Sequence, residues 1–495
     1  MTDADAVEPL VSHGRDGAEE RVRSVVKDCV HCGFCLPACP TYQLWGEEMD
    51  SPRGRIHLVS QLLEGAPLTD AAAEHFDRCL GCMACMTACP SGVQYDQIIE
   101  AAREWTEAAD LPDSGVPAAG VPTGGVEPEV RRPLRDRATR AAIFAVFPYP
   151  RRLRAATAPL RAAQRLGADR LLARAGVVGR VSPAAAAALR LAPPSGRPLP
   201  PGRFPERVPA LGTRRAVVGM LTGCVQSVFF PQVNAATARV LAAEGCDVVI
   251  PRGQGCCGAL SLHSGRVAEA ARFAAGTIEA FEAAGVDAIV VNSAGCGSAM
   301  KEYERLFEHL TEPEGARVAA EAGLGEGPEA GEVSPALAGQ VEADSWVSRA
   351  AALSARVRDL AEFLAELGPV APRHPVPVRA AYHDACHLAH AQRITREPRS
   401  LLREIPGLEL VELGDAGTCC GSAGVHNLLQ PEAARALGAR KADSVLESGA
   451  SLVISANPGC TLQISAELAE RGQPIATAHT AEVLDASIRG VRLRG

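Results

Sequence analysis

The strongest constraint on the fold is a cysteine pattern that occurs twice near the start of the chain. Each copy has the spacing C-x2-C-x2-C-x3-C and a proline directly after the last cysteine. The first copy is Cys29, Cys32, Cys35, Cys39 and Pro40, and the second is Cys79, Cys82, Cys85, Cys89 and Pro90. This is the spacing of bacterial ferredoxins that hold two [4Fe–4S] clusters. A structural zinc site would need neither the third cysteine nor the final Cys-Pro.

The spacing also predicts which cysteines share a cluster. The first three cysteines of a copy can wrap one face of a cubane cluster, whereas the fourth begins a helix and reaches the other cluster. We therefore expect cluster 1 on Cys29, Cys32, Cys35 and Cys89, and cluster 2 on Cys79, Cys82, Cys85 and Cys39. Such clusters transfer single electrons, so the sequence indicates an electron carrier. His31, inside the first copy, is interpreted as tuning a cluster potential rather than as a ligand.

Composition limits the remaining interpretations. The chain has 495 residues, enough for several domains, and its net charge of −8 argues against a nucleic-acid partner. Its 17 cysteines could form a secreted disulfide framework, but the first residues lack the basic and apolar segments of a signal peptide. We therefore expect a cytoplasmic protein, with peripheral attachment to the inner face of the cytoplasmic membrane left open.

Changes in composition divide the chain into four parts. They are a ferredoxin-type domain (1–110), a linker with an arginine-rich helical segment (111–210) and two cysteine-rich units (211–370 and 371–495). Residues 131–180 interleave many arginines with alanine and leucine, which predicts amphipathic helices and a docking surface for a partner. Acidic, low-complexity residues 311–345 are expected to form a mobile surface insertion in the first cysteine-rich unit.

The two cysteine-rich units, named unit 1 and unit 2 below, repeat one order of elements. Buried strands are predicted at 216–221, 246–250 and 288–292 in unit 1, and at 380–383, 408–413 and 452–455 in unit 2. Helical segments separate these strands, which predicts two related α/β units with parallel sheets. The expected fold class is therefore multidomain: a mostly helical, ferredoxin-like dicluster domain (α+β) followed by two repeated α/β units.

Cysteines follow the predicted strands at matching positions in the two units. The unit-1 cysteines are Cys224, Cys256, Cys257 and Cys296, and the unit-2 cysteines are Cys386, Cys419, Cys420 and Cys460. Each set contains a Cys-Cys-Gly element, whose glycine lets the backbone approach closely. Open α/β sheets bind ligands beyond the carboxyl ends of their strands. Each set could hold a further iron–sulfur centre, facing sets could share one, or the thiols could be structural.

Other features of the sequence carry less weight. Residues 253–258 match the G-x-G-x-x-G pattern of dinucleotide loops, but the cysteine pair explains these glycines better. Three histidines lie around Cys386 in the sequence: His383, His387 and His390. They could bind metal, but we favour positions at the surface or beside the cluster ligands, without contact to the metal. Cys246 has no counterpart in unit 2 and is interpreted as a packed thiol. We expect no catalytic residue and no flavin site on this chain.

Seven short motifs together resemble one known family. They are HCGFC (31–35), CPTYQ (39–43), PRGRI (52–56), DRCL (77–80), NAATARVL (234–241), SAGCG (293–297) and CCGSAG (419–424). This combination resembles the iron–sulfur subunit of glycolate oxidase (glycolate dehydrogenase) over nearly the whole chain outside the acidic insertion. Single motifs are also similar to iron–sulfur subunits of lactate-utilisation and anaerobic glycerol-3-phosphate dehydrogenase systems.

The resemblance implies a subunit of a complex that oxidises glycolate to glyoxylate. Flavoprotein subunits would bind FAD, and this chain would carry electrons from them to a respiratory acceptor such as a quinone or a cytochrome. Two alternatives stay open: the same role for lactate or glycerol 3-phosphate, and a thiol–disulfide oxidoreductase similar to heterodisulfide reductase. In heterodisulfide reductase, each cysteine set ends in C-x-x-C. Here Cys296 and Cys460 stand alone at that position, which argues against the non-cubane cluster of that family.

Overall fold

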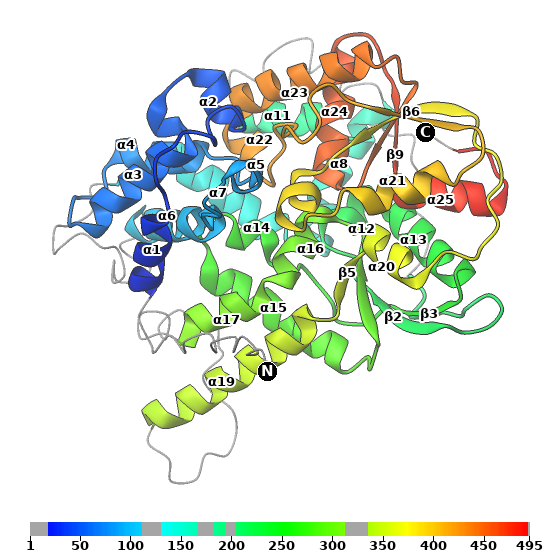
Figure 1. The fold of residues 1–495 in the computed structure, drawn as a ribbon, viewed down its shortest axis with the longest axis horizontal. Helices are drawn as coiled ribbons and strands as arrows, with labels where there is room; N and C mark the ends of the chain where they lie inside the picture. Colours follow the sequence, from blue (N-terminus) through cyan, green and yellow to red (C-terminus); the bar gives the residue numbers. More distant parts are fainter. Residues whose placement is uncertain (1–17, 111–129, 167–181, 194–203, 312–334, 494–495) are drawn as a thin grey trace, which may run out of the picture.

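The computed structural model describes residues 18–110, 130–166, 182–193, 204–311 and 335–493. The first part is helical and lies at one end of the molecule (Figure 1). Its helices are α1 (Ala18–Lys27), α2 (Pro40–Trp45), the 3-10 helix η1 (Glu48–Asp50), α3 (Pro52–Leu63), α4 (Asp70–Arg78), α5 (Ala84–Ala88) and α6 (Tyr95–Asp110). The predicted helical ferredoxin-like domain is confirmed, and its core is formed by α1, α3, α4 and α6 around Val59, Phe76 and Ile98.

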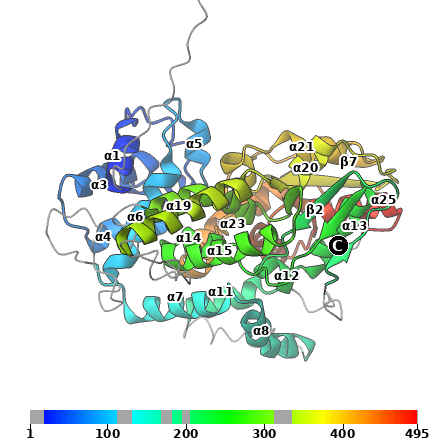
Figure 2. The same cartoon turned by 90° about the horizontal axis from the view of Figure 1, so that it is seen from below.

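Three helices of the arginine-rich linker lie along one side of the molecule (Figure 2). They are α7 (Leu134–Val146), α8 (Pro150–Arg165) and α11 (Pro183–Leu191). Their apolar residues, including Phe144 and Leu191, pack on Val425 and Leu428 of unit 2. Amphipathic helices are thus confirmed for the described part of the segment, whereas residues 111–129 and 167–181 lie outside the described residues.

Two arginines of this segment are not available for docking a partner. Arg132 and Arg140 are buried, and both pair with Asp77 of the ferredoxin domain at 3.1 and 2.9 Å. Arg132 also pairs with Glu107 at 2.8 Å. The expectation of a docking surface is wrong for these two residues, because their charges are already neutralised within the chain. Arg151, Arg152 and Arg154 on α8 remain exposed.

Unit 1 contains a five-stranded sheet in the order β1-β3-β2-β4-β5. The strands are β1 (Arg207–Val208), β2 (Ala216–Met220), β3 (Cys246–Val249), β4 (Ala288–Val291) and β5 (Val357–Asp359). All neighbours are parallel except β1, which pairs antiparallel with β3. The helices are α12 (Val225–Phe229), α13 (Pro231–Ala243), α14 (Ala259–Leu262), α15 (Val267–Glu282), α16 (Ala294–Lys301), α17 (Tyr303–Thr311), α19 (Pro335–Ser354) and α20 (Leu360–Leu367).

Unit 2 repeats this arrangement with a four-stranded parallel sheet, in the order β7-β6-β8-β9. The strands are β6 (Val378–His383), β7 (Leu408–Glu412), β8 (Leu452–Ser455) and β9 (Ala476–His479). The helices are the π-helix η3 (His387–Ala391), α21 (Arg396–Arg403), α22 (His426–Leu429), α23 (Pro431–Glu447), α24 (Pro458–Glu470) and α25 (Thr480–Arg489). The predicted pair of α/β units with parallel sheets is confirmed.

The two units share one hydrophobic core. Val218 and Met220 of β2 belong to the same buried cluster as Ala380 and Tyr382 of β6. Helix α13 of unit 1 packs on α25 of unit 2, and α20 of unit 1 packs on α21 of unit 2 in the same way with the units exchanged. Arg239 of α13 reinforces the first contact through two hydrogen bonds, of 2.8 and 2.7 Å, to the Asp485 carboxylate of α25. The repeat therefore packs as a pseudo-symmetric pair.

Helix α19 includes the last residues of the acidic stretch. Helix α19 begins at Pro335, and its later residues Trp346, Ala350 and Leu353 are buried in the core of unit 1. Trp346 stacks on Phe307 with the ring centroids 5.4 Å apart. Residues 335–345 are therefore helical, residues 312–334 lie outside the described residues, and the mobility of the insertion stays a prediction. Within the described part of the chain, no helix is long and apolar enough to cross a membrane.

Candidate metal centres

The two ferredoxin loops, residues 29–39 and 79–89, have the same backbone conformation around their second cysteine. The residues on either side of it are left-handed in both loops: His31 (φ 52°) and Gly33 (φ 85°), and Gly81 (φ 60°) and Met83 (φ 60°). Backbone turns of this kind aim successive N–H groups at one point and favour anionic clusters. His31 thus occupies the position of Gly81, a backbone role that the sequence interpretation missed.

The cysteines of the two loops lie in crossed groups. Cys39 lines a small cavity, of about 20 Å³, together with Cys79, Cys82 and Cys85. At the group on the first loop, burial raises the pKa of the Cys29 thiol, and the nearby Cys89 and Cys32 add to this rise. Cys39 therefore lies beside the first three cysteines of the second loop, and Cys89 lies near Cys29 of the first loop. The crossed ligand sets stay a prediction.

A buried arginine lies beside the second group. Arg55 of α3 is 1% exposed and donates to the Asp50 carbonyl oxygen at 2.6 Å and to the His75 carbonyl oxygen at 2.6 Å. Burial by itself would raise the pKa of Cys79, but the guanidinium groups of Arg55 and Arg103 outweigh it, and the pKa is lowered. Arg55 therefore stabilises a thiolate, the form of cysteine that binds metal.

The two loops differ in exposure. Cys32 is exposed, and its neighbours Val30 and Phe34 are 69% and 64% exposed. Three cysteines of the second loop, Cys79, Cys82 and Cys85, are buried, with Cys82 only 8% exposed, whereas Cys89 is half-buried. The first loop therefore faces the surroundings and the second faces the interior of the molecule.

One cavity, of about 170 Å³, gathers the cysteines of both units. All eight unit-1 and unit-2 cysteines line it, and so do Cys79, Leu80 and Gly81 of the second ferredoxin loop. We call it the cysteine cavity. The matching strands of the two sheets thus deliver their cysteines to one place, where the sequence predicted two facing sets.

Within each set the thiols lie in contact. The Sγ atoms of Cys224 and Cys256 are 3.5 Å apart. Hydrogen bonds from Cys256 and Cys296 lower the pKa of Cys257 well below its ordinary value. The contact with Cys224, followed by that with Cys257, raises the pKa of Cys256, and the contact with Cys257 raises the pKa of Cys296. One thiolate can therefore form easily but a second cannot, so four thiolates would require a positive metal core. Unit 2 repeats the contacts, with Cys386 beside Cys419 and Cys420 beside Cys460.

The glycine after each cysteine pair is required by a close backbone contact. Gly258 (φ 83°) and Gly421 (φ 87°) are left-handed. A Cβ atom would lie 2.8 Å from the Ala270 carbonyl oxygen at Gly258, and 2.6 Å from the Ala434 carbonyl oxygen at Gly421. The following helix, α15 or α23, therefore packs directly on each Cys-Cys-Gly turn.

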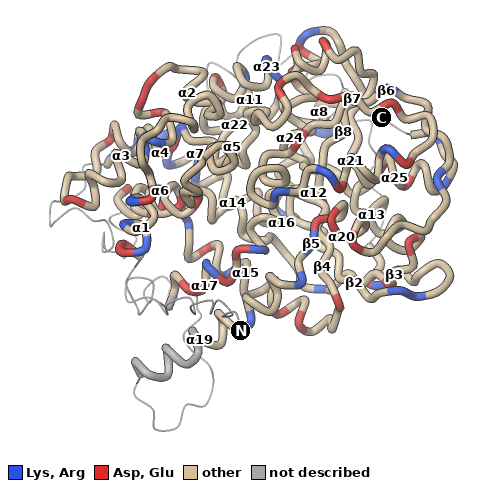
Figure 3. The backbone as a smooth tube through the Cα atoms, in the orientation of Figure 1, with Lys and Arg blue, Asp and Glu red and all other residues tan. Residues whose placement is uncertain are grey.

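The second ferredoxin loop is fastened to both units. Arg103 of α6 donates to the carbonyl oxygens of Cys79 and His263. His426 Nε2 of unit 2 lies 3.3 Å from the Arg78 carbonyl oxygen. Charged residues lie where α6 meets unit 1 (Figure 3): Glu107 of α6 pairs with Arg266 at 3.0 Å, and Glu100 of α6 pairs with Arg305 of α17 at 3.1 Å. These bonds hold the loop over the cysteine cavity.

Cys82 of the second ferredoxin loop lies next to Cys386 of unit 2. They belong to one apolar cluster, together with Cys419. Burial, followed by the neighbouring Cys386, raises the pKa of Cys82 well above its ordinary value. The second ferredoxin group and the unit-2 cysteines are therefore direct neighbours, a relation that no sequence pattern indicated.

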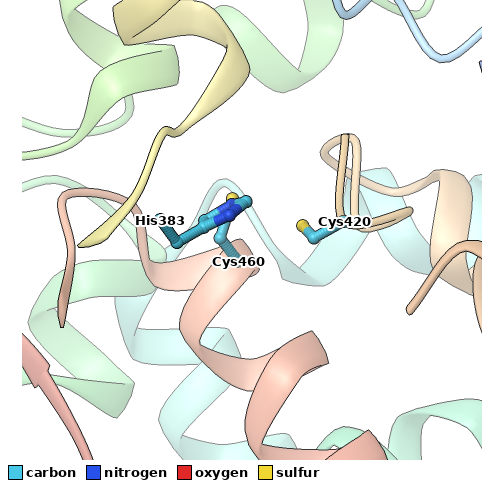
Figure 4. Close-up of side chains that lie close together, drawn as sticks. All are labelled: His383, Cys420 and Cys460. Carbon is cyan, nitrogen blue, oxygen red and sulfur yellow. The ribbon is translucent and has the colours of Figure 1, made fainter. Parts of the chain in front are cut away.

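The three histidines near Cys386 have different surroundings. His390 lies in η3, with Nε2 2.7 Å from the Gly417 carbonyl oxygen, and His387 contacts the second ferredoxin loop. His383 ends β6 and is buried, and one ring nitrogen lies with the Cys420 and Cys460 sulfurs, each within 4.8 Å of the others (Figure 4). Burial lowers its pKa well below the ordinary value, so the imidazole is neutral.

The structure also bears on two weaker motifs. Gln254, inside the 253–258 glycine motif, accepts a hydrogen bond from the Thr222 backbone N–H at 2.7 Å and donates to the Met220 carbonyl oxygen at 3.2 Å. The loop is thus tied to the end of β2. Cys246 is fully buried in β3, where burial raises its pKa to about 11, as expected for a packed thiol.

Three family models match four parts of the chain. Residues 25–93 match a 4Fe-4S dicluster domain, and residues 218–301 and 380–465 each match a cysteine-rich domain. Residues 135–192 match the linker region of the glycolate oxidase iron-sulfur subunit. The two cysteine-rich matches are the two units of the structure.

Curated relatives cover nearly the whole chain. A protein of Bacillus subtilis named probable glycolate oxidase iron-sulfur subunit is 32% identical over 92% of this chain and 93% of its own length. The glycolate oxidase iron-sulfur subunit of Escherichia coli is 32% identical over 89% of this chain and 90% of its own length. Lactate utilization protein A of an Exiguobacterium species is 29% identical over 55% of this chain.

Proposed function

Because the chain belongs to the family of glycolate oxidase iron–sulfur subunits, we propose that it carries electrons in a flavin-dependent complex that oxidises glycolate to glyoxylate. This oxidation releases two electrons and two protons, which the flavin of a partner subunit would accept together. The chain would pass the electrons on singly toward a quinone or a cytochrome. We place no catalytic residue on it.

Two [4Fe–4S] clusters are assigned to the ferredoxin domain. Cluster 1 is held by Cys29, Cys32, Cys35 and Cys89, and cluster 2 by Cys79, Cys82, Cys85 and Cys39. When bound, the clusters supply single-electron transfer at potentials that burial and hydrogen bonds set. The left-handed loop residues, the crossed grouping and the thiolate-stabilising Arg55 all suit this donor set.

The strongest support for relay is the placement of the two loops. The first loop is exposed at Cys32, where a partner can approach. The first three cysteines of the second loop are buried; Cys82 lies beside Cys386, and Cys386 lines the cysteine cavity. The chain therefore aligns its cysteine groups from the surface to the interior, as electron transfer over short steps requires.

We further propose that the unit-1 and unit-2 cysteines each hold an iron–sulfur centre. Four thiols per unit meet at one place, and their mutual effects on pKa oppose ionisation without a cation. All 17 cysteines are free thiols. A purely structural role would leave this repeated arrangement of eight cysteines around one cavity without a physical reason.

The test is purification of the native complex under anaerobic conditions with its flavoprotein subunits. Glycolate, lactate and glycerol 3-phosphate are supplied in turn, and reduction of the iron–sulfur absorbance is followed. We expect glycolate to reduce the clusters fastest, and the isolated chain to show no reduction by glycolate. A faster rate with either other substrate would replace glycolate in the proposal. Glycolate oxidation by the isolated chain would contradict a pure carrier role.

A further inference from the structure

A buried histidine without a protein partner lies at the unit-2 cysteines. His383 is 1% exposed, and neither of its ring nitrogens has a hydrogen-bond partner. One of these nitrogens and the sulfurs of Cys420 and Cys460 lie within 4.8 Å of one another (Figure 4). We propose that His383 is a nitrogen ligand of the metal centre at the unit-2 cysteines. This inference rests on the iron–sulfur centre proposed for that unit and adds a ligand to it.

The three side chains come from three neighbouring strand ends. His383 is the last residue of β6, Cys420 follows β7, and Cys460 lies in α24 after β8. Since β6 lies between β7 and β8 in a parallel sheet, all three are brought to one edge. This carboxyl edge is where α/β sheets bind ligands. The sequence distance between the three is large, which is why the sequence pattern alone favoured other roles for His383.

The donor set fits a metal chemically. Imidazole nitrogen and thiolate sulfur are the donors that bind iron and zinc in proteins. A buried imidazole whose two nitrogens lack partners carries an uncompensated desolvation cost. Coordination of one nitrogen would offset part of that cost. The Cys460 sulfur also accepts a hydrogen bond from Asn457 Nδ2 at 3.4 Å. Hydrogen bonds of this kind commonly support sulfur atoms that bind a metal.

The same position in unit 1 cannot bind metal. His383 stands three residues before Cys386, and Leu221 stands three residues before Cys224. Leu221 is buried in the apolar core of unit 1. A neutral imidazole ligand leaves an iron–sulfur centre less negative than an anionic thiolate at the same place would, and histidine-ligated Rieske clusters have raised potentials.

The test uses the full chain, labelled with 15N-histidine, anaerobically reconstituted with iron and sulfide, and reduced. Iron per chain and nitrogen hyperfine coupling in pulsed EPR are measured for the parent and for His383→Gln and His383→Cys. The signal of unit 2 is identified as the one lost in Cys460→Ala. The matched control is His479→Gln at the end of β9, because His479 is equally buried but bonds to Asn292 and Ala481.

We expect nitrogen coupling at the unit-2 centre of the parent and of His479→Gln. His383→Gln should lose the coupling and the iron of that centre. His383→Cys should keep the iron, lose the coupling and shift the potential of the centre downward. A unit-2 centre without histidine coupling, or unchanged in His383→Gln, overturns the inference and leaves the proposed function standing. No iron beyond that of the ferredoxin-type clusters overturns both the inference and the unit-2 centre.

Discussion

The Nε2 atom of His387 lies 2.8 Å from the carbonyl oxygen of Gly81. Gly81 stands between Cys79 and Cys82 in the second ferredoxin loop, and His387 directly follows Cys386 of unit 2. One short contact therefore joins two cysteine groups that are far apart in the sequence. The Gly81 backbone is buried and His387 is half-buried, so this contact lies within the packed part of the fold and helps to fix the distance between the two groups.

Replacing Cys39 by serine should damage the cluster on the second loop rather than the one on its own loop. Cys39 is 6% exposed and lines the cavity of the second group. Roughly half of the iron of the ferredoxin domain should be lost, since one of its two clusters is affected. Iron analysis and EPR of the anaerobic variant measure this. The control is Cys246→Ala, which should keep both signals; two intact cubane signals in Cys39→Ser would contradict the crossed assignment.

The double variant Cys256→Ala with Cys419→Ala tests the cysteine cavity. Each change removes one thiol of a contacting pair, so we expect the iron beyond the ferredoxin-type clusters to fall and electron transfer through the assembled complex to slow. Iron content and the rate of acceptor reduction are the readouts, with Cys246→Ala again as the control. If the double variant keeps full iron and full transfer, the two units are structural and the ferredoxin domain acts alone.

The exposed residues beside Cys32 should form the contact for a redox partner. Val30 and Phe34 are 69% and 64% exposed around the first loop. Changing both to serine should slow reduction of the chain by its flavoprotein about tenfold, as expected for loss of an apolar anchor, with cluster spectra unchanged. Leu211→Ser, at a residue that is 66% exposed elsewhere, is the matched control. Equal rates for the two variants would place the contact at another surface.

Reversing Arg151, Arg152 and Arg154 to glutamate should weaken assembly with the flavoprotein subunits or attachment to a membrane. The three side chains are exposed on α8, and no acidic residue of the first turn of that helix balances them. Co-purification and membrane fractionation measure the effect, and Arg214→Glu on a different surface is the control. Unchanged assembly and fractionation would show that α8 is simply a solvated helix.

The contact between β5 and α20 should loosen as the pH rises. Burial, aided by Glu362, raises the pKa of Asp359 from 3.8 to about 7. The folded state therefore binds a proton that the unfolded state has released, and this stabilisation disappears as the pH passes 7. The opening free energy of this region should fall by roughly 2–3 kcal/mol between pH 5 and pH 8. Amide hydrogen exchange of residues 357–367, corrected for the intrinsic exchange rates, should show this fall in opening free energy.

Asp359→Asn provides the comparison for that measurement. An asparagine can still accept the hydrogen bond that Asp359 receives from the Ala361 N–H at 2.8 Å, so the start of α20 is kept. The opening free energy of 357–367 should then be nearly independent of pH. A variant with the same pH dependence as the parent would assign the effect to another group.

Much of the fold followed from local patterns. The strands at 216–221 and 288–292 appeared as β2 and β4 within a residue, because a buried parallel strand needs a continuous apolar run. Strands β5 and β9 were not anticipated, because Val357–Asp359 and Ala476–His479 are too short to show a pattern. Helix α19 was missed because its composition resembles a disordered segment, whereas Trp346 anchors it by packing on Phe307.

The sequence by itself determined the chemistry of the chain. The spacing of Cys29 to Cys39 and of Cys79 to Cys89 reflects a loop that must wrap a cluster, and the Cys-Cys-Gly repeats reflect a turn against which a helix packs. These are local requirements, and local sequence records them. Only the tertiary structure decided which groups adjoin: Cys82 beside Cys386, His383 beside Cys420 and Cys460, and Arg132 paired with Asp77. Such contacts depend on how separate elements pack, and no spacing along the chain encodes them.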